Sequence, residues 1–139
     1  MEIIANAVQT VPAKQNVYFT DTVVCGNSSI GHRDDSGLVT LRGVTNQCRA
    51  RFLATFGGNI AIPTGGTVEA ISLAIAIEGE AVPATTMIVT PAAVENYFNV
   101  NASIYIDVSR GCCTRISIIN TSTQDILVQN ANLIIERVA

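Results

Sequence analysis

The feature that most constrains this chain is a strict alternation of apolar and polar residues over positions 98–108. The apolar members are Phe98, Val100, Ala102, Ile104, Ile106 and Val108, and the residues between them are Asn99, Asn101, Ser103, Tyr105 and Asp107. A period of two residues is typical of a β-strand that buries one face and exposes the other. We therefore predict a long strand here.

Shorter segments with the same character predict further strands. β-Branched residues dominate them, and the 3.6-residue period of an amphipathic helix is nearly absent. The predicted strands cover residues 3–10, 16–20, 38–42, 49–56, 68–78, 85–90, 114–120, 126–128 and 131–138. Turn-forming residues separate them at positions 26–28, 34–37, 57–59, 63–66, 78–80 and 109–111. Residues 92–97 are expected to form at most one helical turn.

Eight to ten strands at this spacing predict an all-β sandwich or barrel. The chain has 139 residues, the usual size of one domain, and no linker-like stretch, so we expect a single domain over residues 1–139. Charged residues make up only 14% of the chain, against about 25% in an average soluble protein. Surface that is short of charge is often covered by other subunits.

Residues 68–77 are apolar or small on both faces of the predicted strand. Such a strand either lies between its own core and a neighbouring subunit or is central in a larger monomer. We favour the subunit interface. The residues predicted to form it are Ile71, Leu73, Ile75 and Ile77, together with Leu133 and Ile135 of the last strand.

The charge pattern argues against two classes of partner. The net charge is −3, with seven Arg, a single Lys at position 14 and no basic run, so no nucleic-acid partner is expected. The apolar stretches fall far short of the ~20 residues that a membrane helix needs, so no membrane span is expected.

The first residues lack the basic and apolar regions of a signal peptide. We expect the protein to be made in the cytosol and to reach a surface by lysis or assembly.

Two segments carry a family resemblance. Residues 73–85, LAIAIEGEAVPAT, and the closing residues 131–139, ANLIIERVA, resemble the C-terminal head of the collagen-like exosporium glycoprotein of Bacillus spores. That head is a jelly roll of the tumour-necrosis-factor (TNF) and complement type. The resemblance covers residues 68–139 and implies a two-sheet antiparallel jelly-roll sandwich that forms a homotrimer. No Gly-x-y repeat stands before the resembling segments, so no collagen stalk is expected.

The resemblance gives two expectations for function. The first is a non-enzymatic, homo-oligomeric surface module that decorates or stabilises a phage virion or a bacterial spore or cell surface, with the capsid or spore coat as its larger partner. The second is the carbohydrate- or receptor-binding head of a fibre, with loops 26–37 and 125–130 presenting the glycan or receptor site. Tyr97 and Tyr105 are candidates for an interface or groove, although cross-strand packing is the simpler reading of both.

Cys25, Cys48, Cys112 and Cys113 are the most reactive side chains of the chain. Their even number fits disulfides, and the adjacent pair could bond once within the subunit and once across to a neighbour. The alternative is four free thiols buried in small apolar spaces.

No metal, cofactor or catalytic group is expected. His32 and the cysteines have no zinc-site spacing, and Asp34 and Asp35 read as a solvated turn rather than a calcium loop. His32 itself reads as a surface histidine without a nucleophile motif around it.

The arginines on or beside predicted strands form one more group. We expect them to make ion pairs with acidic residues near a symmetry axis. The arginines are Arg42, Arg49, Arg51, Arg110 and Arg115, and the acids are Glu69, Glu78, Glu95 and Asp107.

Overall fold

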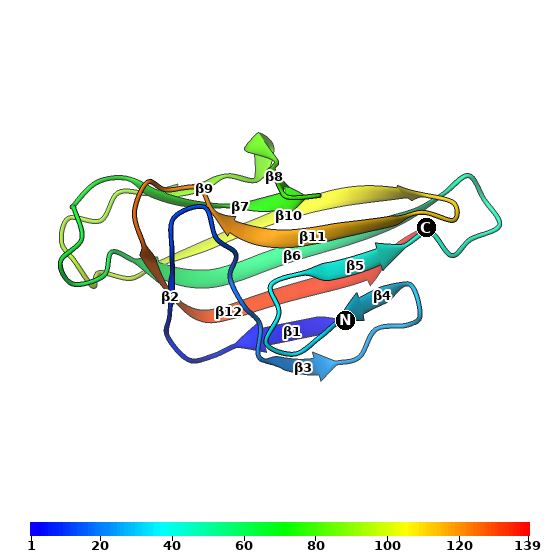
Figure 1. Cartoon of the computed structure of the whole chain (residues 1–139), viewed down its shortest axis with the longest axis horizontal. Coiled ribbons are helices and arrows are strands. Elements are labelled where there is room, and N and C mark those ends of the chain that lie inside the picture. Colours follow the sequence, from blue (N-terminus) through cyan, green and yellow to red (C-terminus); the bar gives the residue numbers. More distant parts are fainter.

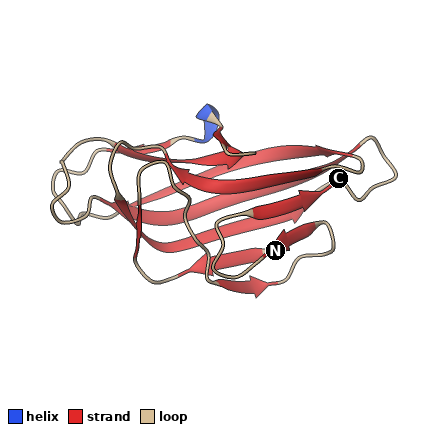
Figure 2. Cartoon of the chain, in the orientation of Figure 1, coloured by secondary structure: helices blue, strands red, loops and turns tan.

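Two antiparallel β-sheets face each other in the computed structural model, which describes residues 1–139 (Figures 1 and 2). Sheet A contains β1 (Glu2–Ala5), β2 (Gln9–Val11), β3 (Asp21–Val24), β6 (Arg49–Ala61), β10 (Phe98–Ser109) and β12 (Ile126–Arg137). Sheet B contains β4 (Ile30–His32), β5 (Val39–Arg42), β7 (Ile71–Ile77), β8 (Glu80–Ala81), β9 (Met87–Val89) and β11 (Cys113–Asn120). The predicted all-β sandwich of two antiparallel sheets is confirmed.

The alternating segment forms β10, as predicted. It pairs with β6 in twelve consecutive steps, from Phe98 opposite Ile60 to Ser109 opposite Arg49. The order of sheet A is β10-β6-β12-β1-β3, with β2 beside β12, and the order of sheet B is β4-β5-β11-β7-β8, with β9 beside β7. β10 therefore lies at the edge of sheet A.

The core fills the space between the sheets with one cluster of 28 buried apolar residues. Phe19, Phe52 and Phe56 are its largest members, and the rings of Phe19 and Phe56 meet edge to face with centroids 6.5 Å apart. Each fully buried ring contributes about 1.5–3 kcal/mol of hydrophobic stabilisation.

The predicted turn at residues 57–59 is wrong, because these residues continue β6. Gly58 faces the core, where a Cβ atom would come within 3.2 Å of Cζ of Phe56. The glycine therefore makes room for a phenyl ring, and it does not turn the chain. The two predicted strands at 126–128 and 131–138 are likewise one strand, β12, with an irregular register between Gln129 and Asn132.

Other boundaries also differ from the predictions. Residues 16–20 make only isolated bridges, at Asn16 and Phe19. The predicted strand at residues 85–90 is shorter, β9, and its first predicted residue instead ends a single 3₁₀ turn, η1 (Pro83–Thr85). Residues 92–97 form bends and a turn with no helix. The strands number twelve because the short β3, β4 and β8 carry too few residues for periodicity to reveal them. None of the helical segments is long and apolar enough to cross a membrane.

Candidate functional site

The six residues predicted to lie at a subunit interface are placed by the structure against the chain's own core. Ile71, Leu73, Ile75, Leu133 and Ile135 are fully buried between the sheets, and Ile77 is partly buried against the same cluster. Ala74 and Ala76 on the other face of β7 are buried as well. These side chains are thus covered without a second subunit, so a self-association surface would lie elsewhere on the molecule.

The outer face of sheet A has uncharged side chains at its centre. It is formed by the side chains of β10, β6, β12 and β1 that point away from sheet B, and we call it the sheet A face. Its central members are Tyr105, Leu53, Thr55, Ser103, Asn101, Gly57, Asn132, Ile134 and Ile4, which oppose one another in register. Tyr105 lies opposite Leu53 and is 65% exposed, while Leu53, Ile134 and Ile4 are partly exposed.

At one end of the sheet A face, Asp107 balances two arginines. The Asp107 carboxylate accepts hydrogen bonds from Arg51 Nε at 2.8 Å and Nη2 at 3.1 Å, and its Oδ2 lies 3.0 Å from Arg49 Nε. The hydrogen bond from Arg51 is the main cause that lowers the pKa of Asp107 below its usual value and raises the pKa of Arg51. Of the ion pairs predicted for the arginines, Arg49–Asp107 and Arg51–Asp107 are present, and both lie within one chain.

Three adjoining depressions that share lining residues form a groove between β1 and β2, the segment around Tyr18, and β4, β5 and β11 of sheet B. The first, of about 300 Å³, is lined by Ala5, Ala7, Val8, Gln9, Tyr18, Thr20 and Asp35. The second, of about 500 Å³, shares Tyr18 and Asp35 with it and adds Asn16, Arg33, Asp34, Ser36, Gly37 and Leu38. The third, of about 450 Å³, shares Arg33, Ser36 and Leu38 and adds Gly31, His32, Thr40, Arg42 and Arg115.

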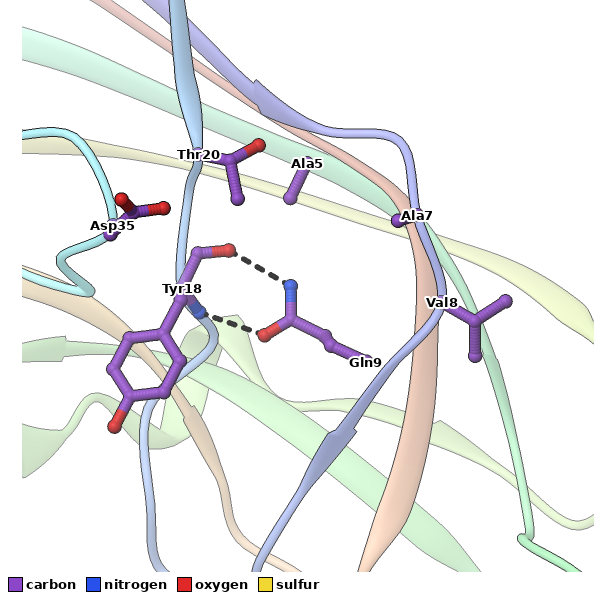
Figure 3. Close-up of a pocket in the computed structure, with 7 residues that line it drawn as sticks. All are labelled: Ala5, Ala7, Val8, Gln9, Tyr18, Thr20 and Asp35. Atoms are coloured by element: carbon purple, nitrogen blue, oxygen red, sulfur yellow. Dashed lines mark hydrogen bonds between the residues drawn. The ribbon is translucent and has the colours of Figure 1, made fainter.

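Tyr18 stands at the junction of the first two depressions. The Gln9 side chain holds its backbone, because Gln9 Nε2 donates to the Tyr18 carbonyl at 2.8 Å and Gln9 Oε1 accepts from the Tyr18 N–H at 3.0 Å. Figure 3 shows the Tyr18 ring pointing away from Gln9, with the Asp35 carboxylate on the same side of the pocket. The ring is 54% exposed, so it is free to stack on a ligand.

His32 lies in the third depression but is not a free surface histidine. Its Nε2 is 3.0 Å from the Ser36 carbonyl oxygen, to which it donates, and its ring packs edge to face on Phe19 at 6.4 Å. Its Nδ1 is buried without a hydrogen-bond partner. The side chain is half-buried, so the prediction of a surface histidine is only partly right.

The Asp34 and Asp35 segment forms a turn, as predicted. Asp35 has a left-handed φ of 66°, and Asp34 Oδ1 accepts a hydrogen bond from the Thr22 hydroxyl at 3.2 Å. The structure brings no three His, Cys, Asp or Glu side chains together in a metal-binding group. Of the two loops predicted to present a ligand site, residues 31–37 line the groove, but residues 126–130 belong to β12 and form no loop.

The four cysteines are free and exposed, so the expectation that they are buried in small apolar spaces is wrong. Cys25, Cys48 and Cys112 lie in the connections β3–β4, β5–β6 and β10–β11 at one end of the sandwich, and Cys113 is the first residue of β11 at the same end (Figure 1). The Cys48 carbonyl accepts a hydrogen bond from the Arg110 N–H at 2.9 Å, and the Cys112 carbonyl accepts one from Gly43 at 2.9 Å. Their cross-linking stays a prediction.

The groove as a whole does not follow from the sequence. Its residues come from segments that are separated along the chain by up to about a hundred positions, so no local pattern marks them. The one available signal was the turn at residues 34–37, which forms the wall shared by the depressions.

Comparisons with known proteins identify the fold. No protein-family model matches the chain, and no curated protein matches it in sequence. The globular domain of the zebrafish complement 1qA protein superimposes with a TM-score of 0.63 over 96% of this chain and 93% of that chain, at 12% identity. The fold is therefore a jelly roll of the TNF and complement type. This part of the resemblance is confirmed, whereas the relation to the exosporium glycoprotein stays a prediction.

Two carbohydrate-binding modules match more loosely. CBM35 from Cellvibrio japonicus Abf62 covers 100% of this chain and 98% of its own, at 9% identity and a TM-score of 0.40. A family 35 module from Clostridium thermocellum covers 91% and 97%, at 12% identity and a TM-score of 0.35. Scores this low carry no argument about function.

Proposed function

We propose that this protein is a non-enzymatic structural module that assembles with copies of itself, as a homotrimer, through the sheet A face and the adjoining free edge of β10. The observation that carries the proposal is the edge strand itself. β10 spans twelve residues, has β6 as its one partner in the sheet, and pairs with it without a bulge. Long flat edges invite pairing with another chain unless Lys, Pro or a bulge blocks them. β10 has none of these.

The composition of the sheet A face also favours contact with a second copy of the chain. Tyr105 and Leu53 offer apolar contact area, and neighbouring Ser103 and Thr55 bond each other at 2.9 Å without carrying charge. Arg51 and Asp107 neutralise each other at one end of this face, while Glu136 opposite Leu53 and Glu2 bonded to Asn132 border its centre. The apolar centre is what favours a second copy, because aromatic residues at the centre of a patch typically anchor an interface.

Light scattering tests the assembly. We expect the wild-type chain at micromolar concentration to give a mass near three times 14.7 kDa. Tyr105→Asp places a charge at the centre of the sheet A face and should shift the mass toward one chain. Ile88→Asp is the matched control, because Ile88 is also 65% exposed but lies on β9 of sheet B. A wild-type mass of one chain contradicts the proposal.

The particle that such a module would decorate, a phage virion or a bacterial spore or cell surface, follows from the resemblance alone. Capsid or tail genes beside the coding gene would support a virion, and coat genes would support a spore.

The proposal that the module is non-enzymatic is supported by His32. Histidine is the residue type most used as a general base, and this histidine is engaged with the Ser36 carbonyl and the Phe19 ring.

Carbohydrate binding is a second candidate function, favoured by the surroundings of Tyr18. Its exposed ring stands beside the carboxylates of Asp34 and Asp35 and the amide of Asn16, and these groups suit sugar hydroxyls. A glycan array with the wild-type chain and Tyr18→Ala tests it. We expect bound glycans that are lost in the variant, and an array without any signal contradicts this candidate.

A further inference from the structure

The third depression of the groove concentrates positive charge. Arg33, Arg42 and Arg115 line it, and no acidic residue does. The chain as a whole has a net charge of −3, yet three of its seven arginines gather at this one concave place. Like charges that are held together without counter-charges repel one another, and an anion bound between them would remove that cost.

The strand register holds two of these arginines on one face. Thr40 of β5 lies between Gly31 of β4 and Arg115 of β11, and Arg42 lies two residues along β5 and so faces the same way. Gly31 has no side chain, and a Cβ atom there would lie 3.0 Å from Nη1 and 3.1 Å from Nη2 of Arg42. The Arg42 guanidinium therefore lies over Gly31, at the floor of the depression.

Most hydrogen-bond donors of these arginines are unused. Arg42 Nη1 donates to the Ser28 carbonyl at 3.3 Å, and the guanidinium groups of Arg33 and Arg115 make no hydrogen bond within the chain. The Glu78 carboxylate accepts from the backbone N–H of Arg115 at 2.7 Å but forms no ion pair with its side chain. The two ion pairs of the chain lie on sheet A. Guanidinium donors in a fixed fork suit carboxylate and sulfate groups.

We propose that the groove binds an acidic glycan, with a carboxylate or sulfate of one sugar against Arg42 and Arg115 and a neutral sugar in the adjoining depression beside Tyr18. The adjoining depression decides the class of ligand. Asp34 and Asp35 line it together with the shared Arg33, so carboxylates outnumber cations there, accept hydroxyl donors and disfavour a second anionic group. A nucleic acid carries a phosphate at every nucleotide and would set one against these aspartates. The inference rests on the carbohydrate-binding candidate and is independent of self-association.

Calorimetric titration of the full chain with three tetrasaccharides tests the inference. The probes are tetragalacturonic acid, which carries only carboxylates, a heparin tetrasaccharide, which adds sulfates, and neutral maltotetraose. We expect at least one acidic probe to bind more tightly than maltotetraose, with an affinity that falls as salt is added. The two acidic probes distinguish carboxylate from sulfate as the preferred group.

Charge-removing variants locate the site. The double variant Arg42→Gln/Arg115→Gln should weaken acidic-glycan binding by about tenfold or more, since two charge-assisted hydrogen-bonding groups are lost. Arg110→Gln is the control for charge loss outside the groove, because it removes one arginine charge from an exposed turn and should keep the wild-type dissociation constant. Gly31→Ala keeps all three charges but displaces the Arg42 guanidinium, so it should weaken binding as well.

Each outcome has a defined meaning. Equal loss in the Arg110→Gln control and the double variant, or tighter binding of an oligothymidylate than of either acidic glycan, overturns the inference. Binding of neutral glycans that depends on Tyr18 but not on the arginines overturns it while leaving the carbohydrate-binding candidate intact. If no glycan of any kind binds, both fail, and the proposal of self-association is untouched.

Discussion

Asp107 pairs with two arginines at the end of the sheet A face. Its lowered pKa makes the stability of the folded chain depend on pH. The hydrogen bond from Arg51 lowers the pKa of Asp107 below the ordinary aspartate value of about 3.9. The unfolded chain therefore takes up the proton at a higher pH than the folded chain does. The stabilisation by the pair is complete above the ordinary pKa and is lost as the pH falls through the lower, folded value.

We predict that Asp107→Asn lowers the thermal midpoint at pH 7 and that this difference from wild type shrinks as the pH falls below 4. The physical reason is that protonation of Asp107 in the wild type removes the same charge that the variant lacks. Scanning calorimetry over a pH series measures it, and NMR titration of the carboxyl gives the pKa directly. A difference that stays constant from pH 7 to pH 2 contradicts the assignment.

Asn120 at the end of β11 joins two loops from inside the core. Its side-chain Nδ2 donates to the carbonyls of Val11 at 3.0 Å, Pro12 at 3.3 Å and Gln124 at 3.0 Å, and its Oδ1 accepts from the Ser122 N–H at 2.9 Å. The residue is fully buried, so these carbonyl groups have no water to replace it.

Asn120→Ala should lower the free energy of unfolding by about 2–4 kcal/mol, because buried carbonyls lose their donor. Urea denaturation of the purified chain gives the number. Asn46→Ala, at an exposed position, is the control and should change stability by no more than about 0.5 kcal/mol. A loss below about 1 kcal/mol at Asn120 would mean that water reaches these carbonyls.

Among the elements, β7 differs most from its sequence-based reading. Its apolar and small residues on both faces suggested a strand between two subunits, but the inward side chains pack on the opposite sheet and the outward alanines are buried too. Its edge at Ile75 is closed by η1, since the Thr85 hydroxyl accepts from the Ile75 N–H at 2.9 Å and Val82 N–H donates to the Ile75 carbonyl at 2.9 Å.

Ile75→Ala should therefore cost about 2–5 kcal/mol, the usual cost of emptying a core position. The loss should be independent of protein concentration, because the packing lies within one chain. Ile88→Ala, at a position 65% exposed, should cost no more than about 0.5 kcal/mol. Denaturation at two protein concentrations measures both, and a loss at Ile75 that grows on dilution would point to an interface instead.

β10 and β6 show which elements can be predicted. β10 follows from eleven residues of alternation, because a period of two has one structural solution. The full length of β6 does not, because two successive glycines at positions 57 and 58 imitate a turn. Pairing of Gly57 with β10 and β12 keeps the strand extended, and Gly58 leaves room for the Phe56 ring.

On the scale of the whole molecule, the chemistry is divided among separate surfaces. The sheet A face has an uncharged centre with charged residues around it, the groove is polar with arginines at one end, and the end of the sandwich with three connections carries every cysteine. The proposed assembly and the proposed glycan site can therefore be tested independently.

All four thiols, at Cys25, Cys48, Cys112 and Cys113, should react with a thiol reagent in the native protein without denaturant, because each is exposed. Titration with Ellman's reagent counts them. Comparison of non-reducing and reducing gels after treatment with oxidised glutathione then tests whether they join copies of the chain. Fewer than four reactive thiols in the freshly reduced, native protein would contradict the exposed placement.

The sequence by itself determined the all-β character, the longest strand and most turn positions, because each depends on residues that are adjacent or two apart along the chain. The family resemblance added the jelly-roll type. Only the tertiary structure decided which apolar faces the chain covers itself, that β12 is continuous, and that Tyr18, Arg42 and Arg115 share one groove. Burial and concave sites depend on which distant segments pair in a sheet, and side-chain periodicity holds no information about that pairing.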